Sequence, residues 1–157
     1  MPSDESGVGT LEDERQITRV LTLYNALLDS REIDRIGTDV YAADAVADYN
    51  SDILHGSRAI VEYIAKGMKP FKDSAHLLSN VSLLSCDGNR AEVTAAQTVW
   101  LWVSESSDQG VGAGTDFAWI FFTWDRLERK PEGWRIVQHR TRVRGSSVAL
   151  TAGPVAV

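Results

Sequence analysis

The feature that most constrains the fold is a change in hydrophobic period near residue 76. Before that point, apolar residues follow helical spacing, most clearly between Ile17 and Leu28. After it, apolar and polar residues alternate as they do in β-strands. Helices followed by long antiparallel hairpins predict an α+β domain whose sheet curls around the helices, because neither layer can bury its apolar face alone. The alternating segments are 76–86, 90–103, 116–129 and 134–145.

Three helices and one further strand are expected in the first half of the chain. Thr10 is predicted to cap the first helix, because acidic residues fill the turn that follows it. A shorter helix is predicted over 32–40, and a strand over 45–50. The third helix is predicted over 56–68, with Ser57 as its cap.

Length and charge limit what the protein can be. A chain of 157 residues predicts one domain, here 11–145, between a disordered segment 1–10 and a tail 146–157 that would cover the mouth of a pocket. The net charge of −6 argues against nucleic acid or an anionic membrane as a partner, because phosphate binding needs clustered Lys and Arg. The single cysteine, Cys86, and the lack of a signal peptide or an apolar membrane span favour a cytoplasmic protein.

Each of the three histidines is a candidate for acid–base chemistry. His55 lies in a predicted turn before a helix and is expected to be exposed. His139 lies on the last predicted strand, on the same face as Val137, Thr141 and Val143, a position typical of a core residue. His76 opens the first long strand, and an apolar pair follows it directly, so a half-buried position is expected.

Asp29 is the candidate partner of His76. It follows Leu27 and Leu28 on the last turn of the first helix, so it could face either solvent or an apolar pocket. A buried carboxylate that accepts the imidazole N–H fixes the tautomer and stabilises the cation formed when the ring takes a proton. Spacing alone leaves open whether the two residues meet. Tyr24 and Tyr49 are candidates to polarise a substrate oxygen, or else to fill the core.

The pocket walls are harder to predict, because the strand 116–129 is apolar on both faces. We expect one face to line a pocket or pack on helices and the other to contact a second subunit, which favours a homo-oligomer. Arg140, Arg142 and Arg144 share one face of the last strand and are expected to be solvated. No His/Cys cluster or phosphate-binding glycine motif predicts a metal or another cofactor. The candidate wall residues are Trp100, Trp102, Trp119 and Phe121.

The order of these elements, with "WRIV" near the end, resembles the NTF2-like, SnoaL-like superfamily over about residues 10–145. Within it, "LLDSREID" and "DSAHLLSN" resemble the branch that contains scytalone dehydratase, bile acid 7α-dehydratase and hexachlorocyclohexane dehydrochlorinase. The resemblance implies a cone-shaped α+β fold with a central pocket. It also implies that Asp29 and His76 form a proton-abstracting dyad, and that Tyr24 and Tyr49 bind the substrate oxygen.

The function implied is that of a cofactor-independent lyase or isomerase acting on a hydrophobic cyclic or polyketide-like small molecule. The same resemblance favours a trimer over a dimer. The alternative is a non-catalytic member of the same fold, either a ligand-binding module or an assembly subunit like the β-subunit of a ring-hydroxylating dioxygenase. Such a subunit needs no dyad.

Overall fold

The structure is a computed structural model that describes residues 9–103, 115–144 and 148–151. Most of the predicted N-terminal segment 1–10 therefore lies outside the described residues. So does most of the predicted tail 146–157, of which only the short strand 148–151 is placed. Within the described residues, no helix is long and apolar enough to cross a membrane.

Helix α1, Leu11–Asp29, begins with the predicted cap. The Thr10 hydroxyl accepts a hydrogen bond from the Asp13 backbone N at 3.1 Å, and the Asp13 carboxylate accepts one from the Thr10 N at 2.9 Å. This reciprocal capping box satisfies two backbone N–H groups that would otherwise lack partners. The predicted helix 32–40 is a single turn, α2 (Ile33–Arg35), followed by a π-helix, η1 (Ile36–Val40).

Helix α3 spans Ser57–Met68 and corrects one prediction. Its N-cap is Gly56 rather than Ser57. Gly56 has a φ of 86°, a left-handed backbone that favours glycine, and it turns the chain directly into the helix. Ser57 is therefore already the first helical residue, and no side chain caps this end.

Within the described ranges, seven strands form one sheet in the order β2-β1-β6-β5-β4-β3, and β7 pairs with β5. β1 and β6 run parallel, whereas the other pairs are antiparallel. Strand β2 was not predicted: His55, placed in a turn by sequence, ends this strand and is exposed. The bounds are β1 Tyr41–Tyr49, β2 Asp52–His55, β3 Phe71–Cys86, β4 Arg90–Val103, β5 Thr115–Lys130, β6 Gly133–Val143 and β7 Val148–Thr151.

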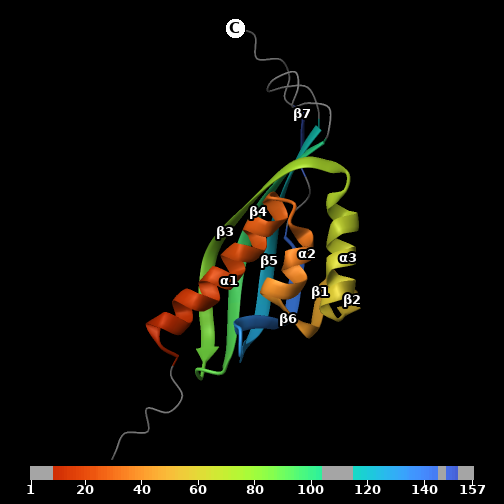
Figure 1. Cartoon of the computed structure of the whole chain (residues 1–157). Coiled ribbons are helices and arrows are strands. Elements are labelled where there is room, and N and C mark those ends of the chain that lie inside the picture. The colour runs from red at the N-terminus through yellow and green to blue at the C-terminus, as the bar shows by residue number, and fades with distance from the viewer. Residues whose placement is uncertain (1–8, 104–114, 145–147, 152–157) are drawn as a thin grey trace, which may run out of the picture.

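The predicted α+β architecture is confirmed, because the helices cover one face of a long, curved sheet (Figure 1). Ile17 from α1, Leu127 from β5 and Trp134 from β6 meet in the core and are at most 2% exposed. Burying each such side chain stabilises the fold by about 1.5–3 kcal/mol. The core cluster runs along α1 from Ile17 to Leu28 and includes Ile60 and Ile64 of α3.

Helix α1 is attached to the sheet at both ends. At its start, the Gly9 backbone N donates to the Cys86 carbonyl at 2.8 Å, and Arg129 on β5 donates to the buried carboxylate of Asp13. At its far end, Asp29 accepts hydrogen bonds from β3. The position of Asp29 is therefore set by the helix as a whole.

Candidate active site

Asp29 and His76 lie in direct contact. Asp29 Oδ1 is 2.6 Å from His76 Nδ1, and Asp29 Oδ2 accepts a hydrogen bond from the His76 backbone N at 2.9 Å. Ser74, two residues earlier on β3, donates its hydroxyl to Asp29 Oδ1 at 2.8 Å. Three donors thus hold the carboxylate in one orientation, and Asp29 in turn orients the imidazole.

Local sequence explains why this carboxylate turns inward. Leu27 and Leu28 are buried at 2% and 4% exposure, and they fix the last turn of α1 against the sheet. The helix ends at Asp29 with Ser30 as its C-cap, and the next residue, Arg31, has a left-handed backbone with a φ of 64°. Its guanidinium donates to the Phe71 carbonyl at 3.2 Å, which ties the helix end to the start of β3. The Asp29 side chain is left 31% exposed, between core and solvent.

The surroundings of His76 favour its neutral form. Its side chain is 6% exposed. Burial lowers the pKa of His76 below the usual value, the Asp29 carboxylate opposes this, and the charge of Arg31 adds to the lowering. A neutral ring whose Nδ1–H is donated to Asp29 carries its lone pair on Nε2. His76 is therefore prepared to accept a proton at Nε2, and Asp29 to stabilise the resulting cation.

His76 borders an apolar cavity of about 280 Å³ between the helices and the concave face of the sheet. Of the predicted wall residues, Trp119 and Phe121 line it. Trp100 and Trp102 do not line it, and this prediction is corrected. On β4 they alternate with Val99 and Leu101, and it is these smaller residues that face the cavity.

Tyr24 and Tyr49 also line the cavity, and their hydroxyls lie 3.1 Å apart. Tyr41, which sequence reasoning did not single out, adds a third hydroxyl to this hydrogen-bonded row, since its hydroxyl is 3.2 Å from that of Tyr49. Two hydrogen bonds among three hydroxyls leave one O–H to donate elsewhere. Burial raises the pKa of Tyr24 to about 12 and raises those of Tyr41 and Tyr49 well above the usual value, so all three remain donors at neutral pH.

Sequence reasoning also missed Ser74 and a second histidine–carboxylate pair. Ser74 shares the strand face of His76, two residues away, and that spacing was the available signal. His139 is 5% exposed and thus buried as predicted, but it also lines the cavity, and its Nδ1 is 2.6 Å from Asp125 Oδ1. Asp125 faces it from the neighbouring strand.

The three arginines of the last strand lie away from this cavity. Arg142 binds Asp48 through two nitrogens, at 2.6 and 2.8 Å, and Arg140 lies 3.8 Å from the same carboxylate. Arg144 lies over the ring of Phe122. Asp48 therefore points away from its neighbour Tyr49 on β1, and the arginine face is occupied by ion pairs within the chain.

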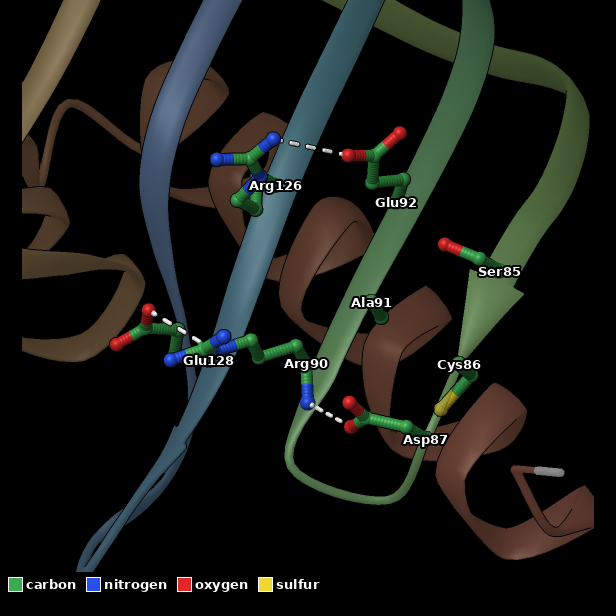
Figure 2. Close-up of a pocket in the computed structure, with 8 residues that line it drawn as sticks. All are labelled: Ser85, Cys86, Asp87, Arg90, Ala91, Glu92, Arg126 and Glu128. Atoms are coloured by element: carbon green, nitrogen blue, oxygen red, sulfur yellow. Dashed lines mark hydrogen bonds and ion pairs between the residues drawn. The ribbon is translucent and has the colours of Figure 1, made fainter. Parts of the chain in front are cut away.

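A second, larger pocket of about 540 Å³ lies on the outer face of the sheet, beside the β3–β4 turn (Figure 2). Its charged side chains bind one another: Arg126 donates to Glu92 at 3.0 Å, and Arg90 lies 3.8 Å from Glu128. It holds no histidine, and its paired charges account for its polar lining. We therefore assign the candidate site to the smaller, apolar cavity.

No group of three or more His, Cys, Asp or Glu side chains in the described part of the chain could hold a metal ion.

The profile of the SnoaL-like domain matches residues 9–140. The chain belongs to the SnoaL-like family. In this SnoaL-like protein the match spans α1 and most of the sheet, including Asp29, Ser74, His76 and His139. No curated protein matches the sequence.

Solved structures resemble this SnoaL-like protein in fold. A candidate aromatic ring hydroxylase from Novosphingobium aromaticivorans has a TM-score of 0.77 at 19% identity, over 90% of this chain and 96% of its own. A candidate scytalone dehydratase from the same organism has a TM-score of 0.76 at 15% identity, over 94% of this chain and 95% of its own. Hexachlorocyclohexane dehydrochlorinase LinA-type3 from Novosphingobium barchaimii has a TM-score of 0.74 at 13% identity, over 89% of this chain and 91% of its own. At these identities the likeness establishes the NTF2-like fold.

Proposed function

We propose that this SnoaL-like protein is a cofactor-independent lyase or isomerase that removes a proton next to a carbonyl of a hydrophobic cyclic small molecule. The observation that carries the proposal is the contact between His76 and Asp29 at the wall of an apolar cavity. A structural ion pair does not need to border a cavity, whereas a general base must reach a substrate. Two structural neighbours are named for eliminations, a dehydratase and a dehydrochlorinase.

The proposed reaction begins at His76 Nε2, which takes the proton from the carbon next to the carbonyl. Asp29 stabilises the imidazolium, and the one O–H that the hydrogen-bonded hydroxyls of Tyr24, Tyr49 and Tyr41 leave free donates to the carbonyl oxygen as it gains negative charge. In elimination, the electron pair of the C–H bond forms a C=C bond while the C–O bond at the next carbon breaks. The proton is then returned to the departing hydroxyl, and water leaves. In isomerisation, the proton returns to another carbon.

The size of the cavity narrows the class of substrate. A volume of about 280 Å³ is at the lower end for small-molecule sites. Aromatic and aliphatic side chains form most of its wall, so a compact molecule with one or two rings and few charges fits it best. An assembly subunit of the same fold needs neither this cavity nor the dyad.

Deuterium exchange tests the base without knowledge of the natural substrate. 2-Tetralone, a bicyclic ketone with acidic C–H groups next to its carbonyl, is incubated in D₂O, and mass spectrometry measures the deuterium gained. We expect the wild type to accelerate exchange, and His76→Gln to reduce the rate by about 10²–10⁴-fold. Asp29→Asn should also reduce it, because the imidazolium loses its counter-charge.

His55→Gln is the matched control, because His55 is exposed on β2 and does not line the cavity. Equal exchange by the wild type and His76→Gln would remove His76 as the base. Binding of 2-tetralone without accelerated exchange would instead identify a ligand-binding module.

A further inference from the structure

His139 and Asp125 form a second histidine–carboxylate pair at the same cavity. The two residues are directly opposite each other on β6 and β5, and both side chains are 3% exposed. Because Asp125 occupies Nδ1 of the ring at 2.6 Å, Nε2 is the nitrogen left to meet a ligand. The side chain of His139 belongs to the cavity lining together with that of Thr141.

A β-bulge allows His139 to face inward. At the start of β6, Trp134 and Ile136 are buried, so regular alternation would next bury Gln138. The register shifts at this point, because Arg126 pairs with Gln138 whereas Leu127 pairs with Ile136. Val137 is the extra residue, and beyond it His139 and Thr141 face inward instead. Bulges that re-aim a side chain are frequent next to active sites.

The residues around His139 could accommodate a positive charge on its ring. Among the described residues, the buried Asp125 side chain is hydrogen-bonded to the ring of His139. An imidazolium at His139 would make the pair with an Asp125 carboxylate electrically neutral. Three aromatic rings surround it: the centroids of Tyr49, Tyr24 and Tyr41 lie 5.1, 6.0 and 6.1 Å from that of His139. Aromatic rings at this distance stabilise a cation.

The groups that face His139 come from three elements. Asp125 on β5 is the charged one. Tyr24 on α1 and Tyr41 and Tyr49 on β1 are phenols, and burial keeps them protonated at neutral pH. His139 thus lies between the carboxyl group of Asp125 and three tyrosine rings whose hydroxyls are linked to each other. His76 borders the cavity from β3, three strands away in the sheet.

We infer that His139, held by Asp125, is a second catalytic acid–base group, which donates the Nε2 proton to the substrate oxygen while His76 removes the C–H proton. The inference rests on the proposed function and changes one step of it, because His139 and not the protonated His76 supplies the proton to the oxygen. The substrate then carries its acidic C–H toward His76 and a carbonyl or hydroxyl oxygen toward His139. As the C–H electron pair forms the new double bond, the oxygen takes the proton from His139. An enol or a released water results, with His76 protonated and His139 neutral, and proton exchange with solvent restores both.

4-Nitrophenol is the probe, because it is a small ring whose phenolate form is measured by absorbance and which undergoes no turnover. If His139 is a cationic donor, the wild type binds the phenolate in preference to the phenol, and the pH midpoint of the bound probe falls below that of the free probe. His139→Gln should weaken phenolate binding by about 10- to 100-fold, the loss expected for one charge-assisted hydrogen bond. Asp125→Asn should weaken it in the same direction.

His55→Gln is the control for an unrelated histidine, and His76→Gln separates the two proposals. His76→Gln should slow tetralone exchange by about 10²–10⁴-fold but retain the preference for phenolate. A preference that survives in His139→Gln, or its absence in the wild type, would overturn the inference and leave the role of His76 intact. If His139→Gln does not fold, ¹⁵N NMR of the wild-type histidine rings decides: protonation of both nitrogens of His139 at pH 7 supports the inference, and a neutral ring overturns it.

Discussion

Ser74 offers a direct measure of how firmly the Asp29 carboxylate is held. Its hydroxyl is buried and donates to Asp29 Oδ1 at 2.8 Å. A hydrogen bond to a charged group contributes about 1.5–3 kcal/mol to stability. Because the Asp29 side chain is 31% exposed, water replaces part of the lost bond, and Ser74→Ala should cost about 1.5 kcal/mol, at the lower end of that range.

Urea unfolding followed by tryptophan fluorescence measures this cost. With a typical denaturant dependence of about 2 kcal/mol per molar urea, the midpoint should fall by about 0.5–1 M. In an Asp29→Ala background the acceptor is already absent, so the same substitution should cost almost nothing. The double-mutant cycle therefore predicts a coupling of about 1–1.5 kcal/mol between the two residues.

Ser79→Ala is the matched control, because Ser79 lies on the same strand but is exposed, and its hydroxyl makes only a long contact of 3.4 Å with the Ala96 carbonyl. It should change stability by less than about 0.5 kcal/mol. A Ser74→Ala variant as stable as Ser79→Ala, or additive effects in the cycle, would show that Ser74 does not hold the carboxylate.

Three further predictions follow from the same site. The pKa of His76 is lower in the folded than in the unfolded chain, so as pH falls below the usual value of 6.5 the unfolded chain binds the proton first. Stability from His76 is thus present above pH 6.5 and lost below it, and pH-dependent unfolding of His76→Gln should lack this part of the loss. Tyr49→Phe removes the central hydroxyl of the tyrosine chain and should lower the unfolding free energy by about 1–3 kcal/mol in urea titrations, whereas an unchanged value would mean that water replaces it. Trp119→Phe should weaken calorimetric binding of 2-tetralone about fivefold through lost apolar contact, and Trp100→Phe should not, unless the assignment of strand faces is wrong.

The sequence predicted those parts of the fold that local patterns control. The alternation in 90–103 defined β4 with its correct bounds, and Thr10 followed by acidic residues correctly indicated the start of α1. Asp29 and His76 were singled out by residue type and position, but their contact joins residues 47 apart in sequence. Only the packing of α1 across β3 brings them together.

The features that the sequence did not predict depend on the register between strands and on which residues face each side of the sheet. Trp100 and Val99 are both apolar, so the alternation of apolar and polar residues could not decide which of the two faces the cavity. Val137 was expected on the same face as His139, and regular alternation gave no sign of the bulge that separates them. The parallel pairing of β1 with β6 is a long-range contact with no local signal.

Because α1 is attached at both ends, the position of the catalytic carboxylate does not depend on the residues that shape the cavity. The proton-handling carboxylate is positioned by Arg129 and Asp13 at one end of the helix and by Ser74 and His76 at the other. The residues that shape the cavity, such as Val99 and Phe121, belong to neither attachment. Exchanging them changes which molecule fits while the acid–base geometry stays in place, so this scaffold is suited to acquiring new substrates by mutation or by laboratory selection.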